Sequence, residues 1–138
     1  MKAVAAGSAA ALVWGALEPL DRRLFRHDYS DIAVLGKAFT RGSGWRPLGF
    51  AIHALNGAIF GAVYYEIAKR VSRNPRRLAV ELALLEHATL FSTGMLVDRH
   101  HPARGEPGVA TLFSRQAFAQ ATVRHALFGV VLGALAPD

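Results

Sequence analysis

Apolar and polar residues are segregated along this chain into four long apolar stretches, which are separated by charged connections. The apolar stretches cover about residues 3–17 or 3–20, 47–67, 78–97 and 112–136. Each approaches the roughly 20 residues that a helix needs to cross a hydrocarbon core about 30 Å thick. The sequence therefore predicts an all-α integral membrane protein, a four-helix bundle formed by a single domain over residues 1–138.

Turn and charge signals bound these stretches. Pro47 opens the second stretch at a first-turn position, where a missing N–H is not needed. Asn74 precedes the third, and the charged residues 98–102 end it. We interpret Glu18 and Pro19 as the polar end of a first span rather than part of a signal peptide, because no small-residue cleavage site precedes a polar mature sequence.

The first connection, residues 21–46, is too long for a simple turn between adjacent helices. Ser30 has the right chemistry to cap a short helix. Four residues after it share one apolar stripe at helical spacing: Ile32, Leu35, Gly36 and Phe39. We therefore expect either a short helix in the membrane interface between spans 1 and 2 or an irregular loop.

The charged residues and the absence of cysteine limit the kinds of partner that we expect for this chain. Its net charge is +6, and it has no cysteine, which excludes disulfides and thiolate metal sites. The basic residues flank the apolar stretches instead of forming a stripe with aromatics, so we expect a lipid bilayer and anionic lipid head groups as partners, and no nucleic acid. Nine Lys and Arg residues lie in the first and third connections and six on the other face, which leaves the orientation open.

Small residues recur at helical spacing in three of the four stretches. Six glycines mark these stripes: Gly7, Gly15, Gly57, Gly61, Gly129 and Gly133. In lipid, helices associate through close backbone approach rather than through a hydrophobic force. We predict helix contacts along these stripes, which are also compatible with a homo-oligomer or with docking to a larger membrane complex.

Ionisable and amide side chains interrupt the apolar stretches at similar depths, as the rise of 1.5 Å per residue places them. They are Glu18, His53, Asn56, Glu86, His87, Gln120, Arg124 and His125. Charged groups at membrane depth are unfavourable, and they normally face the interior of a bundle. The sequence predicts a buried polar cluster of these residues, open toward the longer loops.

Three interpretations of this cluster stay open. In the first it is structural: Glu86 pairs with Arg124, and the histidines bond to the backbone or to each other. In the second, a small transporter or proton-conducting bundle uses Glu86, His87 and His125. In the third, His87 and His125 ligate a b-type haem for electron transfer, and the same two histidines are the candidates for any metal ion.

Nothing in the sequence supplies a catalytic motif. His100 and His101 precede a proline without an accompanying nucleophile or phosphate loop, which is typical of a solvated helix end. Trp14 and Trp45 are expected to anchor the chain at the membrane interface. The sequence favours a small structural or accessory subunit with several membrane passes, in a membrane of the bacterial inner-membrane type.

Overall fold

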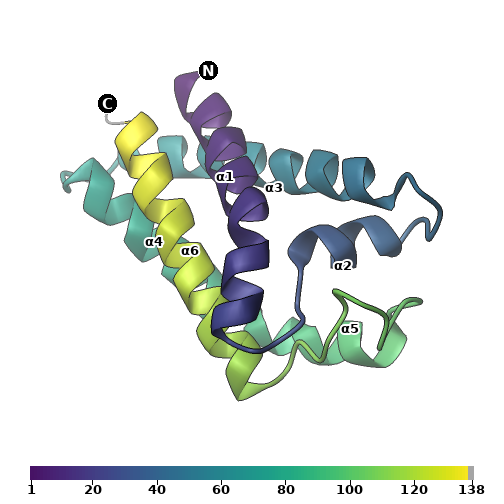
Figure 1. Ribbon diagram of the computed structural model, residues 1–138. Helices are drawn as coiled ribbons and strands as arrows, with labels where there is room; N and C mark the ends of the chain where they lie inside the picture. The colour runs from purple at the N-terminus through teal and green to yellow at the C-terminus, as the bar shows by residue number, and fades with distance from the viewer. Residues whose placement is uncertain (137–138) are drawn as a thin grey trace.

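The structure is a computed structural model that describes residues 1–136, and helices dominate it (Figure 1). The elements are α1 (Lys2–Leu24), α2 (Asp31–Lys37), α3 (Trp45–Ala68), α4 (Pro75–Leu90), the 3₁₀ turn η1 (Phe91–Thr93), α5 (Gly94–His100) and α6 (Arg115–Leu135). Within residues 1–136, four helical segments are long and apolar enough to span a membrane: α1, α3, α6 and the segment Pro75–His100. The prediction of an all-helical fold with four such helices is confirmed, and it is consistent with a multi-pass membrane protein.

Polar side chains begin three of the helices at the turns that the sequence marks. The Ser30 hydroxyl accepts a hydrogen bond from the backbone N–H of Ala33 at 3.0 Å and caps α2. Asn74 caps α4 and Ser114 caps α6 in the same way. The short helix expected after span 1 is therefore present, and its place in a membrane interface stays a prediction.

The first helix is longer than expected, because it continues through Pro19 to Leu24. A proline inside a helix removes one backbone hydrogen bond, so the turn that follows needs other support. Asp21 supplies it by accepting a hydrogen bond from Arg124 of α6 at 2.5 Å. Two arginines in the last turn also suit the negative end of the helix dipole.

The third predicted span is interrupted at η1, so α4 and α5 are separate helices. The Thr93 hydroxyl donates to the backbone carbonyl of Leu90 at 2.6 Å, a local bond that bends helices. The last helix begins at Arg115 instead of residue 112. The backbone N–H groups of Leu112 and Phe113 are taken by the Asp98 carboxylate at 2.6 and 2.8 Å, which holds these residues outside the helix.

The long helices do not all pack against one another to the same extent. α1 packs along both α3 and α6, and α4 packs on the other side of α6. α3 and α4 share few contacts, so the bundle is open between them. The start of α1 and the end of α6 lie at one end of the molecule, and α2 and α5 lie at the other end, which we call the loop end (Figure 1).

The predicted glycines lie where helices approach most closely. A Cβ on Gly57 of α3 would collide with the backbone carbonyl of Gly7 of α1. A Cβ on Gly129 of α6 would lie 2.6 Å from the Cα of Val80 in α4. The others, Gly15, Gly61 and Gly133, also face neighbouring helices. These contacts are within one chain, and assembly into an oligomer stays a prediction.

An apolar core fills the half of the bundle near the termini. Its buried members include Ala3, Ala6, Ala10, Tyr64, Leu78, Ala79 and Leu132. Tyr64 is part of this core, and its hydroxyl donates to the carbonyl of Pro75 at 3.1 Å. The buried polar side chains that the sequence singles out therefore lie mostly toward the loop end.

The third connection is ordered by its contacts with α2. His101 is buried, and its Nε2 lies 2.9 Å from the carbonyl oxygen of Val34. The Lys37 ammonium donates to the carbonyl of Pro107 at 2.9 Å and pairs with Glu106 at 3.1 Å. The expectation of a solvated helix end was wrong for His101, because its ring joins this connection to α2.

Candidate functional site

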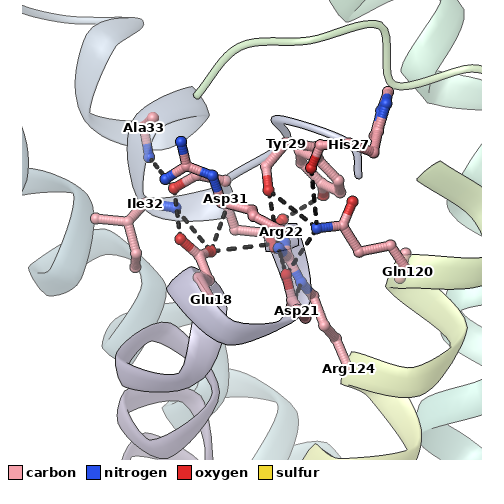
Figure 2. A network of polar contacts seen from close by, with 12 residues as sticks. Glu18, Asp21, Arg22, His27, Tyr29, Asp31, Ile32, Ala33, Gln120 and Arg124 are labelled. Carbon is pink, nitrogen blue, oxygen red and sulfur yellow. Dashed lines mark hydrogen bonds and ion pairs between the residues drawn. The ribbon is translucent and has the colours of Figure 1, made fainter. Parts of the chain in front are cut away.

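Arg124 of α6 is the centre of a buried cluster at the loop end (Figure 2). Its side chain is 2% exposed. The guanidinium donates to both carboxylate oxygens of Asp21 at 2.5 and 2.6 Å, to Asp31 at 2.6 Å and to the carbonyl of Tyr29 at 2.8 Å. We call this set the Arg124 cluster; its members are Glu18, Asp21, Tyr29, Asp31, Gln120 and Arg124.

Glu18 joins the cluster to the start of α2. One of its carboxylate oxygens accepts hydrogen bonds from the backbone N–H groups of Asp31 at 2.7 Å and Ile32 at 3.3 Å, and the other accepts from the Ser30 hydroxyl. The guanidinium of Arg124 lies 3.6 Å away. The Glu18 carboxyl group thus lies between the Arg124 guanidinium and the first turn of α2.

Asp31 stays ionised inside this cluster. Burial opposes its ionisation, but the Arg124 guanidinium, then His53 and a hydrogen bond from the Tyr29 hydroxyl, hold the pKa of Asp31 below its usual range. Burial raises the pKa of Tyr29 well above its ordinary value, so its phenol keeps the proton that it donates. Asp31 therefore carries the negative charge that Arg124 requires.

The cluster has the properties of a structural joint. It joins α1, α2 and α6, and Gln120 adds a hydrogen bond from its amide nitrogen to Asp21 at 2.7 Å. Of the predicted site residues, it gathers Glu18, Gln120 and Arg124. The expected pairing of Glu86 with Arg124 was wrong, because the Arg124 guanidinium is bonded to carboxylates of α1 and α2 instead.

Sequence analysis missed Asp21, Tyr29 and Asp31 as members of this cluster. They lie at the end of the first stretch and in the connection after it, where polar residues are expected. A signal was present in Arg124 itself, since an arginine inside an apolar stretch needs carboxylates within reach. The nearest supply is the acidic residues that flank the neighbouring span.

A second polar region lies inside the bundle next to the cluster. It is a cavity of about 270 Å³ lined by His53 of α3, His87 of α4 and His125 of α6. We call it the histidine cavity; further lining residues include Trp14, Asn56, Phe60, Glu86, Leu90 and Phe128. The three predicted histidines are thus brought around one space.

Aromatic rings hold the histidines in place. The Trp14 ring packs edge-on against His53 and His125, with centroids 5.0 and 4.8 Å apart. The rings of His87 and His125 stack at 4.8 Å with 27° between their planes. Trp14 is only 6% exposed, so its expected role as an interfacial anchor was wrong. It is a wall of the cavity.

The polar atoms around the cavity are only partly satisfied. His87 Nε2 lies 3.0 Å from the Thr122 hydroxyl, and His125 Nδ1 lies 2.8 Å from the carbonyl of Ala121. The Nε2 atom of His53 and the Nε1 atom of Trp14 are buried with no hydrogen-bond partner in the part of the chain that the structure describes. A buried polar group without a partner costs about 1–3 kcal/mol, so these two nitrogens lower the stability of the fold unless something bonds to them.

Asn56 and Glu86 lie at the open side of the bundle. Asn56 is exposed, and the Glu86 side chain is 41% exposed, so neither belongs to a closed interior as expected. The reason is the separation of α3 and α4. The space between these helices is a second cavity of about 520 Å³, which we call the α3/α4 groove. It shares Asn56, Phe60, Glu86 and Leu90 with the histidine cavity.

The site was tested against the cofactors that the sequence suggests. Bis-histidine haem ligation requires the two imidazoles on opposite faces of the porphyrin. His87 and His125 stack face to face at 4.8 Å, which leaves no room for a porphyrin between them, so the residues do not fit haem b. Within residues 1–136, no three His, Asp or Glu side chains are arranged to hold a metal ion.

The chain was also compared with known proteins. No model of a known protein family, no curated protein and no solved structure matches it. The geometry of the histidine cavity and the α3/α4 groove is therefore the basis for assigning a function.

Proposed function

We propose that this chain is a small multi-pass membrane protein that binds a small ligand in the histidine cavity, as an accessory subunit or a transporter-like bundle. The observation that carries the proposal is the state of His53. Its side chain lines the cavity and is only 7% exposed, and its Nε2 has no hydrogen-bond partner among residues 1–136. A ligand that bonds to this nitrogen would remove an unfavourable desolvation.

A purely structural role for the polar residues is supported for only one of the two regions. The Arg124 cluster matches it, since ion pairs and hydrogen bonds surround the guanidinium. The histidine cavity contrasts with it, because an interior that only stabilises helices normally packs without voids of this size. The size and the unpartnered atoms favour binding.

Proton conduction is the second candidate. His125 Nε2 lies 3.9 Å from a Glu86 carboxylate oxygen and its ring stacks on His87, so a proton has titratable groups to move between. A route across the membrane would also have to pass the apolar core near the termini, where Ala3 and Leu132 are buried. Ligand binding needs no such route and is the simpler proposal.

The outer surfaces of the helices support the membrane environment that we propose for this protein. The four candidate spans support a lipid bilayer. The basic segment from the connection after α3 into the first turn of α4 supports contact with anionic head groups; it carries Lys69, Arg70, Arg73, Arg76 and Arg77. A bacterial inner membrane and a homo-oligomeric or larger assembly stay part of the proposal.

Native mass spectrometry of the purified protein tests ligand binding. We expect a molecule of defined mass on the wild-type protein, prepared both in mild detergent and in lipid nanodiscs. His53→Leu should lose it, because the hydrogen-bonding nitrogen is replaced by an apolar group of similar size. His100→Leu is the matched control, since His100 is exposed and does not line the cavity. A wild-type protein without any bound mass in both preparations would contradict the proposal.

A further inference from the structure

The α3/α4 groove offers a path from the bilayer into the histidine cavity. Its wall is largely apolar, and its lining includes Ile59, Val63, Ile67, Leu82 and Leu85. Both helices that form it are candidate membrane spans, so lipid chains would surround its mouth. Because the groove and the cavity share boundary residues, an apolar molecule in the bilayer could reach the histidines without crossing the head-group region.

The charges along this path have one sign. Among the described residues that line the cavity and the groove there is no lysine or arginine, and the acidic groups are Asp31 and Glu86. Asp31 is already paired with Arg124 and bonded by Tyr29. Within the described residues, the ion-pair partner of Glu86 is His125, whose Nε2 lies 3.9 Å from the carboxylate. A carboxylate in apolar surroundings favours a cation beside it and opposes an anion.

The other groups around Glu86 suit an ammonium group. A neutral imidazole nitrogen without a proton accepts a hydrogen bond, and the Nε2 of His53, a residue that lines the cavity, has no partner among residues 1–136. The Asn56 side chain supplies a carbonyl oxygen at the boundary of the two cavities. Aromatic rings complete the wall, and their faces attract cations; they are Trp14, Phe60, Phe91 and Phe128.

We infer that the histidine cavity binds a lipid-soluble amine that enters between α3 and α4. Its ammonium group lies between Glu86 and His53, and its apolar body occupies the α3/α4 groove. This inference rests on the proposed function, because it assigns the chemical class of the ligand to the same cavity.

Trp14 provides a direct readout of binding. The chain has two tryptophans, so Trp45→Phe leaves Trp14 as the single reporter inside the cavity wall. The protein in lipid nanodiscs is titrated with octylamine, octanol and octanoate, which share one alkyl chain and differ in the head group. We expect a saturable change in Trp14 fluorescence with octylamine at concentrations at least about tenfold lower than with the other two.

Two pairs of variants, each made in the Trp45→Phe protein, test where the amine binds. Glu86→Gln should weaken the octylamine response about tenfold or more, whereas Glu81→Gln should not, because Glu81 pairs with Arg73 and Arg77 outside both cavities. Val63→Phe should weaken it by filling the groove. Val130→Phe is its control, on an exposed position of α6. Asn56→Leu tests the same boundary if Glu86→Gln does not fold.

The possible outcomes separate this inference from the proposed function. An equal or stronger response to octanol or octanoate overturns the amine, while a bound mass on the wild-type protein keeps the cavity as a ligand site. An unchanged octylamine response in Val63→Phe overturns the lateral path. A wild-type protein that forms oligomers which Val63→Phe loses also overturns it, because a second copy of the chain would then fill the groove. No response to any compound and no bound mass would overturn both.

Discussion

The Arg124 cluster and the histidine cavity are neighbours on the same helices, yet their polar atoms are satisfied to very different degrees. In the cluster, the guanidinium contacts three carboxylates and a backbone carbonyl. In the cavity, His53 and Trp14 each keep a buried nitrogen without a partner within residues 1–136. The cluster is bonded around its guanidinium, although the buried Oε1 of Gln120 has no partner within residues 1–136. Bonded polar networks rigidify a fold, whereas unbonded buried groups weaken it.

This difference separates groups that hold the fold from groups that are available to a ligand. Both kinds look alike in the sequence, as ionisable residues inside apolar stretches. The cluster lies where α1, α2 and α6 meet at the loop end, so that short connections bring carboxylates to Arg124 (Figure 2). In the cavity, aromatic rings pack against the histidines, and no arginine or lysine lies in the described lining.

Removal of Arg124 should have the largest effect on stability. Arg124→Met leaves Glu18, Asp21 and Asp31 close together without their cation, and breaking a buried ion pair from one side costs about 3–5 kcal/mol. We expect a large loss of thermal stability in detergent, measured by the unfolding midpoint.

The control for this variant is Arg115→Met, on an exposed position at the start of the same helix. Adding Asp31→Asn to Arg124→Met should recover part of the lost stability, because it removes one of the uncompensated charges. Equal stability of Arg124→Met and Arg115→Met would mean that the cluster does not hold the helices together.

Glu18→Gln should have the next largest effect. The substitution replaces one of two accepting oxygens with an amide donor, which faces the Ser30 hydroxyl or the N–H groups of α2. We expect a loss of about 1–3 kcal/mol in the free energy of unfolding, measured by denaturant titration. Glu66→Gln, at a surface ion pair with Lys69, should leave it nearly unchanged.

The fold could be predicted because hydrophobic pattern and length act locally. The apolar stretches give the four long helices, and Ser30 and Asn74 begin helices where the sequence indicates. The ends were less accurate. α1 passes through Pro19 because of a contact with α6, and η1 breaks the third stretch where a local side-chain bond bends it. Tertiary contacts of this kind leave no local pattern.

For the site residues, the sequence predicted the depth along the helix axes but not the direction of the side chains. Matching depth brought His87 and His125 together correctly, since their rings stack. Depth does not give the direction in which a side chain points, and Glu86 points toward the open side between α3 and α4 instead of toward Arg124. The same lack of angular information misplaced Trp14, which lies in the cavity wall.

Acid should weaken the loop end through Asp28, with a smaller effect. Burial opposes ionisation of this side chain, but a hydrogen bond from the backbone N–H of Gly108 and the Arg22 guanidinium together hold the pKa of Asp28 below its usual range. A carboxyl with a lower pKa in the folded state stabilises the fold above its ordinary pKa of about 3.9, and this contribution is lost as the pH falls below that value.

Asp28→Asn should therefore lower the free energy of unfolding at pH 7 by less than about 1 kcal/mol, since the side chain is half-exposed, and the difference should be smaller at pH 3 than at pH 7. Denaturant titrations of both proteins at the two pH values measure it. A difference that stays constant between them would show that the charge of Asp28 does not contribute.

His53→Leu should have the smallest effect on stability and the clearest effect on binding. Leucine has a similar size and no polar atom, so the substitution removes a buried nitrogen that has no partner in the described chain. We expect the free energy of unfolding to stay within about 1 kcal/mol of the wild type, because removal of the unpartnered nitrogen offsets the loss of the ring's hydrogen bond to the Ala11 backbone. Thermal unfolding beside Arg124→Met measures the contrast. If His53→Leu is as destabilising as Arg124→Met, the cavity histidines hold the fold as the cluster does, and the distinction between the two regions is wrong.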